Sequence, residues 1–204
     1  MISETIESLK QRGVIERIED APHLARALDS GGPQRIKFGI DPTAAELHLG
    51  HAVIFRLLKK LQEAGHIIVL IIGDFTAVIG DPSGRSEARK MLTEAEVKAN
   101  EKRYLKQIGK FIDLKRTEVR HNREWLKKGG AKLLFELMAL ASLQQVLERQ
   151  DFKKRIAEGR ELTLLEALYP VLQGYDSVAV NADVEIGGSD QEFNLLMGRR
   201  LQRK

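Results

Sequence analysis

Two of the chain's five histidines lie three positions apart in DPTAAELHLGH, residues 41–51, directly after an apolar run. Residues i and i+3 are neighbours on a helical surface, so His48 and His51 share one face of a helix that begins there. Imidazoles can donate hydrogen bonds to oxygens that gain charge when a phosphoryl centre is attacked. Gly50 would let a flat ring approach the backbone. The spacing therefore favours contact with a phosphate chain.

Two other interpretations of the histidine pair stay open. A zinc site needs further ligands, and a chain without cysteine must take them from its other histidines or from carboxylates. A purely structural pair is the usual role of isolated histidines, but the position behind Asp41-Pro42-Thr43 at the end of a strand makes it less favoured here.

The elements around the pair predict an α/β fold. RIKFGI, residues 35–40, reads as a short strand, and HAVIFRLLKKLQEAG repeats apolar residues with helical spacing before Gly65 closes the helix. HIIVLIIGDF is almost wholly apolar, as a parallel strand covered on both faces would be. Strand, helix and strand form a βαβ unit with a right-handed crossover.

Further elements follow along the chain. A polar, mostly helical stretch runs to about Asn122, and FIDLKRTEVRH could contain another strand. We expect one helix over Leu133 to Leu147, whose broad apolar surface lies in the core or covers a partner subunit. The last part predicts a helix that ends near Gln173-Gly174, a strand around Val180 to Glu185, and a helix that starts near Asp190.

Composition excludes several classes of protein. Without cysteine the chain has no disulfide framework or thiolate metal site, and its first residues lack the apolar core of a signal peptide. The longest apolar run, IIVLII, is too short to span a bilayer, so we expect a cytoplasmic protein with no membrane partner. The net charge of +4 suits a polyanionic partner, but solvated helix faces produce the same excess.

Three glycine-containing segments, DPTAAELHLGH, GDFTAVIGDPSGRS and EIGGSDQEFN, leave strands with small or acidic residues. In open α/β sheets, ligands bind outside the carboxyl ends of the strands, where helix N-termini can receive phosphate. These segments therefore outline a nucleotide site. Neither GxGxxG nor GxxxxGK[ST] occurs, which argues against dinucleotide dehydrogenases and P-loop enzymes.

At this point the chain resembles a known family. HLGH resembles the HIGH signature of class I aminoacyl-tRNA synthetases, and KFGIDPTAAELHLGH, IGDPSGRS, YPVLQGYDSVAV and EIGGSDQEFN resemble bacterial tyrosyl-tRNA synthetases. The resemblance implies a Rossmann-like parallel sheet flanked by helices, with a mainly helical connecting insertion at about residues 90–150. It also implies activation of L-tyrosine with ATP to tyrosyl-adenylate, transfer to tRNA(Tyr), and a homodimer. ATP would be a substrate accompanied by Mg²⁺, with no permanent cofactor and no protein metal site.

The resemblance assigns roles by position. Contacts to the phosphates of ATP are implied for His48, His51, Thr43, Arg85 and Arg89. The adenosine pocket would comprise Gly39, Asp41, Gly50, Gly188 and Asp190. The ammonium of tyrosine would be held by Asp81, Tyr169 and Gln173, its phenol by Asp176, and its ring, surroundings and carboxylate by Thr76, Asn122 and Gln191.

Asp176 decides the substrate. A buried acceptor at the end of an amino-acid pocket favours tyrosine, because phenylalanine would leave that acceptor unpaired. From the residues alone, Asp176 could instead cap a helix after Gly174, and Tyr169 could be an ordinary core aromatic.

The match departs from the family in two places. Many bacterial members have a tyrosine and then a small residue where this chain has Lys37 and Phe38, so we assign Lys37 no role in the site. The family's KMSKS loop and anticodon-recognising region do not occur in these residues, which implies an N-terminal catalytic portion. Two alternatives remain: a folded fragment that binds tyrosine without turnover, and another HxGH adenylyltransferase.

Overall fold

The computed structural model describes residues 2–44, 46–79 and 92–203. Its elements are, in order, α1 (Ile2–Gln11), α2 (Ala21–Ser30), β1 (Arg35–Ile40), α3 (Leu49–Glu63), β2 (Ile67–Ile72), α4 (Thr76–Ile79), α5 (Glu94–Ile108), η1 (Leu114–Arg116), β3 (Thr117–His121), α6 (Arg123–Leu140), α7 (Leu143–Leu147), α8 (Gln150–Ala157), α9 (Leu164–Ala179), β4 (Val184–Ile186), η2 (Ser189–Gln191) and α10 (Glu192–Gln202). Within these residues the strands form a parallel sheet in the order β3-β2-β1-β4, which confirms the α/β prediction.

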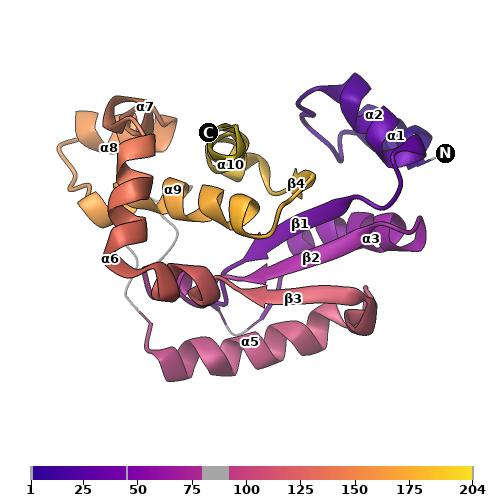
Figure 1. Cartoon of the computed structure of the whole chain (residues 1–204), viewed down its shortest axis with the longest axis horizontal. Coiled ribbons are helices and arrows are strands. Elements are labelled where there is room, and N and C mark those ends of the chain that lie inside the picture. The colour runs from indigo at the N-terminus through magenta and orange to yellow at the C-terminus, as the bar shows by residue number, and fades with distance from the viewer. Residues whose placement is uncertain (1, 45, 80–91, 204) are drawn as a thin grey trace.

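One face of the sheet is packed mainly with apolar side chains. Alternate residues of a strand point to opposite faces, and the even-numbered apolar residues of β1 and β2 join one core with α3 and α5. Phe55 and Leu58 of α3 and Ile108 of α5 have no exposed area in this core. Figure 1 shows α5 running beneath β3.

The other side of the sheet carries the later helices. α9 lies against α10 over this side (Figure 1), and α6, α7 and α8 join them in a second apolar cluster. The two helices approach each other closely, since a Cβ added at Gly174 would lie 2.9 Å from the backbone nitrogen of Gly198. Glycine at both positions therefore allows this contact between helix backbones.

Three predicted boundaries were wrong. α9 does not end at Gly174 but runs to Ala179. Gly174 does not interrupt the helix and instead allows the close contact with α10. The strand expected from Val180 is the shorter β4, and Val180 caps the end of α9. The single helix expected from Leu133 is divided, because Ala141 is extended and Ser142 accepts a hydrogen bond from the Gln145 amide to begin α7.

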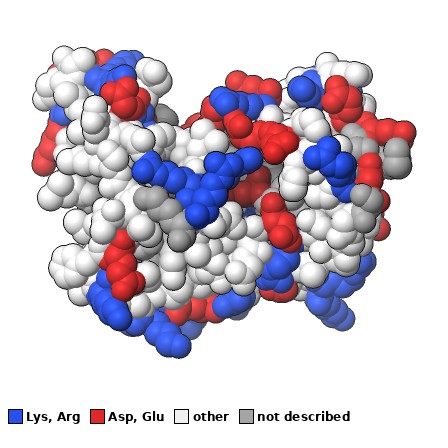
Figure 2. Space-filling model, turned by 45° about the horizontal axis from the view of Figure 1, so that its top comes forward, with Lys and Arg blue, Asp and Glu red and all other residues white. Residues whose placement is uncertain are grey.

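The span 90–150 is not purely an added helical segment. β3 lies within it and pairs with β2 as an edge strand of the sheet, so part of that span belongs to the central fold, and the insertion boundary stays a prediction. Figure 2 shows Lys and Arg side chains in separate groups among acidic and uncharged atoms on the face it presents. Among the described helices, none is long and apolar enough to cross a membrane.

Candidate active site

Polar side chains from three strand ends meet at the carboxyl edge of the sheet. Asp41 follows β1, Thr76 begins α4 after β2, and Asn122 follows β3. Thr76 Oγ1 donates to Asp41 Oδ1 at 2.8 Å, and Asn122 Nδ2 donates to Thr76 Oγ1 at 2.9 Å. Thr76 and Asn122 are buried. The predicted residues Asp41, Thr76 and Asn122 thus form one hydrogen-bonded row where ligands bind in open α/β sheets.

α9 supplies the second wall of the site. Tyr169, Gln173 and Asp176 are spaced i, i+4 and i+7, so they line one face of the helix over about 10 Å. The Tyr169 hydroxyl donates to Asp41 Oδ2 at 2.9 Å, which joins this face to the row of strand-end residues. Tyr169 is therefore more than a core aromatic, and Asp176 lies inside the helix, not at its cap.

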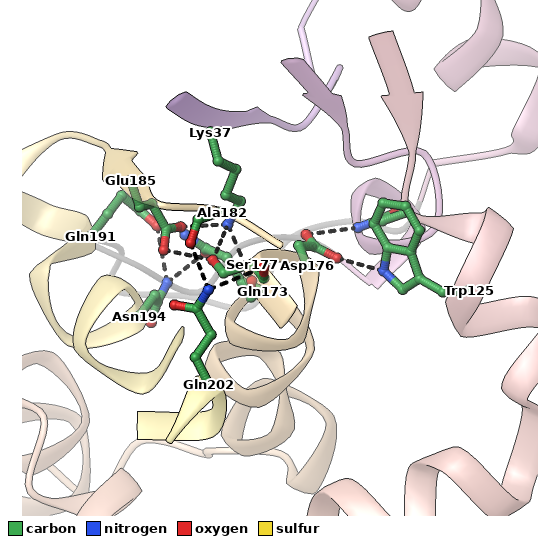
Figure 3. Close-up of polar contacts among 11 residues, drawn as sticks. Lys37, Trp125, Gln173, Asp176, Ser177, Ala182, Glu185, Gln191, Asn194 and Gln202 are labelled. Atoms are coloured by element: carbon green, nitrogen blue, oxygen red, sulfur yellow. Dashed lines mark hydrogen bonds and ion pairs between the residues drawn. The ribbon is translucent and has the colours of Figure 1, made fainter. Parts of the chain in front are cut away.

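Asp176 lies buried at the far end of this face. Trp125 Nε1 of α6 donates to its Oδ1 at 2.9 Å, and Asn122 Nδ2 lies 3.5 Å from its Oδ2 (Figure 3). Burial raises the pKa of Asp176 to about 7, against the opposing effects of the Lys37 charge and the hydrogen bonds from Trp125 and Asn122. The carboxyl therefore changes protonation state near neutral pH, where it can accept one further hydrogen bond.

Gln173 and Gln191 meet through a residue to which we had given no role. Asn194 of α10 donates from Nδ2 to Gln173 Oε1 at 2.8 Å and to Gln191 Oε1 at 2.9 Å. Its own Oδ1 accepts from the buried guanidinium of Arg149 at 3.1 Å. Asn194 is the last residue of the segment EIGGSDQEFN, so its position in that motif could have identified it from the sequence.

The two histidines do come together at the start of α3. Their ring centroids lie 3.9 Å apart, and His51 Nδ1 accepts from the His48 backbone amide at 3.3 Å. Burial, and then the proximity of His48, lower the pKa of His51, opposed in part by hydrogen bonding with the His48 backbone, so the neutral ring is favoured. A Cβ at Gly50 would lie 3.0 Å from the ring of His48, so the glycine makes room for that ring.

The remaining predicted residues are spread along the same edge or lie outside the described chain. Gly39 is exposed in β1, and Thr43 stands in the turn after it. Gly188 precedes η2, where exposed Asp190 accepts from Gln191 Nε2 at 3.0 Å. Asp81, Arg85 and Arg89 fall within residues 80–91, outside the described residues.

Lys37 is the residue that sequence reasoning excluded and the structure brings in. Its side chain has no exposed area, and its ammonium contacts Glu185, Ser177 Oγ at 3.2 Å and the Gln173 carbonyl at 3.3 Å (Figure 3). The alternation of side chains along β1 could have indicated this position. Lys37 lies between Ile36 and Phe38, which face the apolar core, so its own side chain points to the opposite side of the sheet.

The zinc alternative gains no support from the described part of the chain. No group of three or more His, Asp or Glu side chains there is arranged to hold a metal ion.

The family is shown by sequence. The family model described as tRNA synthetases class I (W and Y) matches residues 29–204. A tyrosine–tRNA ligase of Burkholderia thailandensis is 46% identical over 97% of this chain and 48% of its own length. One of Moorella thermoacetica is 48% identical over 95% of this chain and 48% of its own length. The chain spans about half the length of the curated relatives it matches.

Solved structures agree with this assignment. A C-terminally truncated mitochondrial tyrosyl-tRNA synthetase of Aspergillus nidulans superposes with a TM-score of 0.82 at 28% identity, covering 95% of this chain and 59% of that one. A tyrosyl-tRNA synthetase of Archaeoglobus fulgidus, solved with L-tyrosine, shares the fold at a TM-score of 0.68 and 21% identity, over 88% of this chain and 53% of that one. Together with the parallel sheet and the side chains at its carboxyl edge, these matches establish that the chain belongs to the class I tRNA synthetases of the tryptophan and tyrosine group.

Proposed function

We propose that this chain forms the part of a tyrosine–tRNA ligase that binds L-tyrosine and ATP and joins them as tyrosyl-adenylate. The single observation that carries the proposal is Asp176, a buried carboxyl at the end of a polar helix face that accepts a hydrogen bond from Trp125. Its relatives named as tyrosine–tRNA ligases support the choice of reaction.

Tyrosine would lie along the face of α9. Its phenol would donate to Asp176, and its ammonium would lie toward Tyr169 and Gln173, with Asp81 contributing from the segment outside the described residues. Phenylalanine in the same place would leave the buried Asp176 acceptor without a partner, which is costly. Gln191, which accepts from Asn194, would contact the carboxylate.

ATP would occupy the carboxyl edge beside tyrosine. Gly39, Asp41, Gly50, Gly188 and Asp190 would surround adenosine, with Asp190 accepting from the ribose hydroxyls. Contacts with the phosphates would come from Thr43, His48, His51, Arg85 and Arg89. Mg²⁺ bound with ATP would neutralise phosphate charge.

The reaction needs no enzyme nucleophile. The tyrosine carboxylate attacks the α-phosphate, the bond to the β-phosphate oxygen breaks, and pyrophosphate leaves. Catalysis then consists of positioning and of hydrogen bonds to oxygens that gain charge. A neutral His51, favoured by its lowered pKa, still carries one N–H that can donate to such an oxygen.

Tyrosine-dependent exchange of pyrophosphate into ATP tests the proposal. We expect exchange that requires tyrosine and falls at least ~100-fold in a His48→Ala, His51→Ala double variant, because such donors act on the transition state. Tyrosine binding by calorimetry should be the same in both proteins. Calorimetry without any tyrosine binding would contradict the proposal and favour another HxGH adenylyltransferase. Binding without exchange would favour the narrower function of holding tyrosine.

Transfer to tRNA(Tyr), a cytoplasmic location and a homodimer are further parts of this proposal. Apolar side chains on α6 and α7 support the dimer, since Phe135, Met138 and Leu143 are exposed by 67%, 52% and 56%. Clustered exposed apolar residues mark contact surfaces. Sedimentation should show a dimer that a Phe135→Asp substitution converts to monomer, and a wild-type monomer at high concentration would contradict the dimer.

A further inference from the structure

A fully buried lysine beside the site needs a structural explanation. Lysine is almost never fully buried unless its charge is paired, and Lys37 of β1 is buried on the side of the sheet that faces α9. Its register partner in β4 is Glu185, so the two charges lie directly opposite each other on neighbouring strands. The pair is thus built into the strand register.

The ion pair is tied directly to the helix that carries Asp176. Ser177, the next residue of α9, accepts from Lys37 Nζ and donates to Glu185 Oε2 at 2.7 Å. The Gln173 carbonyl accepts from the same ammonium. Figure 3 shows Lys37, Ser177 and Glu185 on one side of Asp176 and Trp125 on the other.

The two charges act on Asp176 in opposite directions. The ammonium of Lys37 lowers the pKa of Asp176, whereas the carboxylate of Glu185 raises it and burial raises it most. Trp125 of α6 and Asn122, which immediately precedes that helix, face Asp176 with neutral donors. Asp74 and Arg123 are paired with each other, and Asp41 is linked to Asn122 through Thr76 and to α9 through the Tyr169 hydroxyl.

We propose that Lys37 is a specificity-determining positioning residue, whose buried ammonium, held by Glu185 and Ser177, keeps Asp176 an ionised acceptor for the substrate phenol. This inference rests on the proposed function, because it concerns the same tyrosine site. Lys37 acts through Asp176 and need not touch the substrate. Glu185 pairs with the buried ammonium and opposes its effect on Asp176.

Lys37→Met and Glu185→Gln remove charges of opposite sign, so they should shift the pH midpoint of tyrosine binding in opposite directions. A role of Lys37 in supporting the fold alone would not produce this difference. In Lys37→Met the positive charge disappears, and at neutral pH Asp176 becomes mostly a neutral carboxyl, which is a weaker acceptor than the carboxylate. In Glu185→Gln the ammonium keeps Ser177 and the Gln173 carbonyl as partners, and its whole charge acts on Asp176. Tyrosine binding should then persist to lower pH.

The test measures dissociation constants for L-tyrosine and L-phenylalanine by calorimetry from pH 5.5 to 8.5. We expect Lys37→Met to weaken tyrosine binding by about fivefold at pH 7, with phenylalanine changed less than about threefold, since a rise of one pKa unit from about 7 lowers the ionised fraction of Asp176 about fivefold at that pH. The pH midpoint of tyrosine binding should rise in Lys37→Met and fall in Glu185→Gln. Lys37→Arg, which keeps the charge, should restore part of the preference.

Arg155→Met is the matched control, because Arg155 is a buried cation paired with Glu166 at the first turn of α9. It should lower stability while leaving the tyrosine-to-phenylalanine ratio and the pH midpoint unchanged. If Lys37→Met does not fold, the double variant with Glu185→Gln removes both charges. Because Lys37 affects Asp176 more than Glu185 does, the double variant should still lose part of the preference and raise the pH midpoint by a smaller amount.

The outcomes distinguish the two proposals. A folded Lys37→Met or double variant with the wild-type ratio and pH midpoint would overturn the role of Lys37. Midpoints that move in the same direction in Lys37→Met and Glu185→Gln would also overturn it. A wild-type protein without preference for tyrosine over phenylalanine would instead overturn the proposed function.

Discussion

The two faces of the central sheet differ in what they bury. The face toward α3 and α5 holds apolar side chains such as Phe38 and Phe55, whereas the face toward α9 holds Lys37, Glu185 and Asp176. Burying apolar area stabilises the fold, and buried charges cost free energy unless they are paired. The α9 side also carries apolar clusters, so among the described residues the two sides differ in that only this one adds the buried charged groups that the proposed function uses to select the substrate.

Phe55→Ala should have the largest effect on the apolar face. Phe55 has no exposed area and packs edge-on against Phe38 at 5.7 Å between ring centroids. Its loss should lower the free energy of unfolding by about 3–5 kcal/mol, as for other buried phenylalanines. Denaturant unfolding measures this, and the surviving folded protein should retain its preference for tyrosine. A lost preference would mean that the two faces are not separate in function.

Asp176→Asn should have its main effect on binding. Hydrogen bonds to charged groups contribute about 1.5–3 kcal/mol, so tyrosine affinity should fall by roughly 10- to 150-fold at pH 8. Calorimetry with tyrosine and phenylalanine measures the change, and phenylalanine should bind no worse than before. If both ligands weaken equally, the carboxylate does not select the phenol.

The pH dependence should be opposite for stability and for binding. The folded pKa of Asp176, about 7, is above its unfolded value near 3.8, so the folded state binds more protons between these pH values. This carboxyl therefore lowers stability as pH rises from about 4 to 7, after which its effect is constant.

Ionisation of the same carboxyl should improve tyrosine binding through about pH 7, because the phenol needs an acceptor. Unfolding and calorimetric titrations at matched pH measure both trends. The Asp176→Asn protein should show neither the fall in stability nor the gain in tyrosine binding with rising pH. If it keeps one of these trends, that trend belongs to another titrating group.

His48→Ala should have the smallest effect on stability. His48 is exposed at the start of α3, and exposed substitutions usually change stability by about 0.5 kcal/mol or less. Thermal unfolding should therefore be close to wild type, while pyrophosphate exchange falls. A large loss of stability would favour the purely structural interpretation of the histidine pair.

Local pattern was sufficient to predict the strands β1 and β2 and the helix between them. Their apolar periodicity is strong and is not opposed by tertiary contacts. The end of α9 was predicted wrongly because Gly174 reads as a helix stop in sequence, although in the fold it makes room for α10. The local sequence does not show which backbone segment will pack against a glycine, because that depends on the tertiary structure.

The site was predictable where a motif marked it. Asp41, Thr76, Asn122, Tyr169 and Asp176 were named from sequence, and the structure connects them by hydrogen bonds. Lys37 was excluded because it departs from the family, and its pairing with Glu185 depends on strands far apart in sequence. Departures from a motif can therefore mark residues whose role depends on long-range pairing.

The contact between Gly174 and Gly198 bears on how this protein can vary in evolution. A methyl group at Gly174 would meet the backbone of α10, and one at Gly198 would meet Ser177 Oγ and Glu185 Oε2, each at 3.0 Å. Either change would push apart the helices that carry Asp176 and Asn194. We expect selection to retain both positions in descendants that keep the substrate, even though neither glycine has a side chain with which to recognise it.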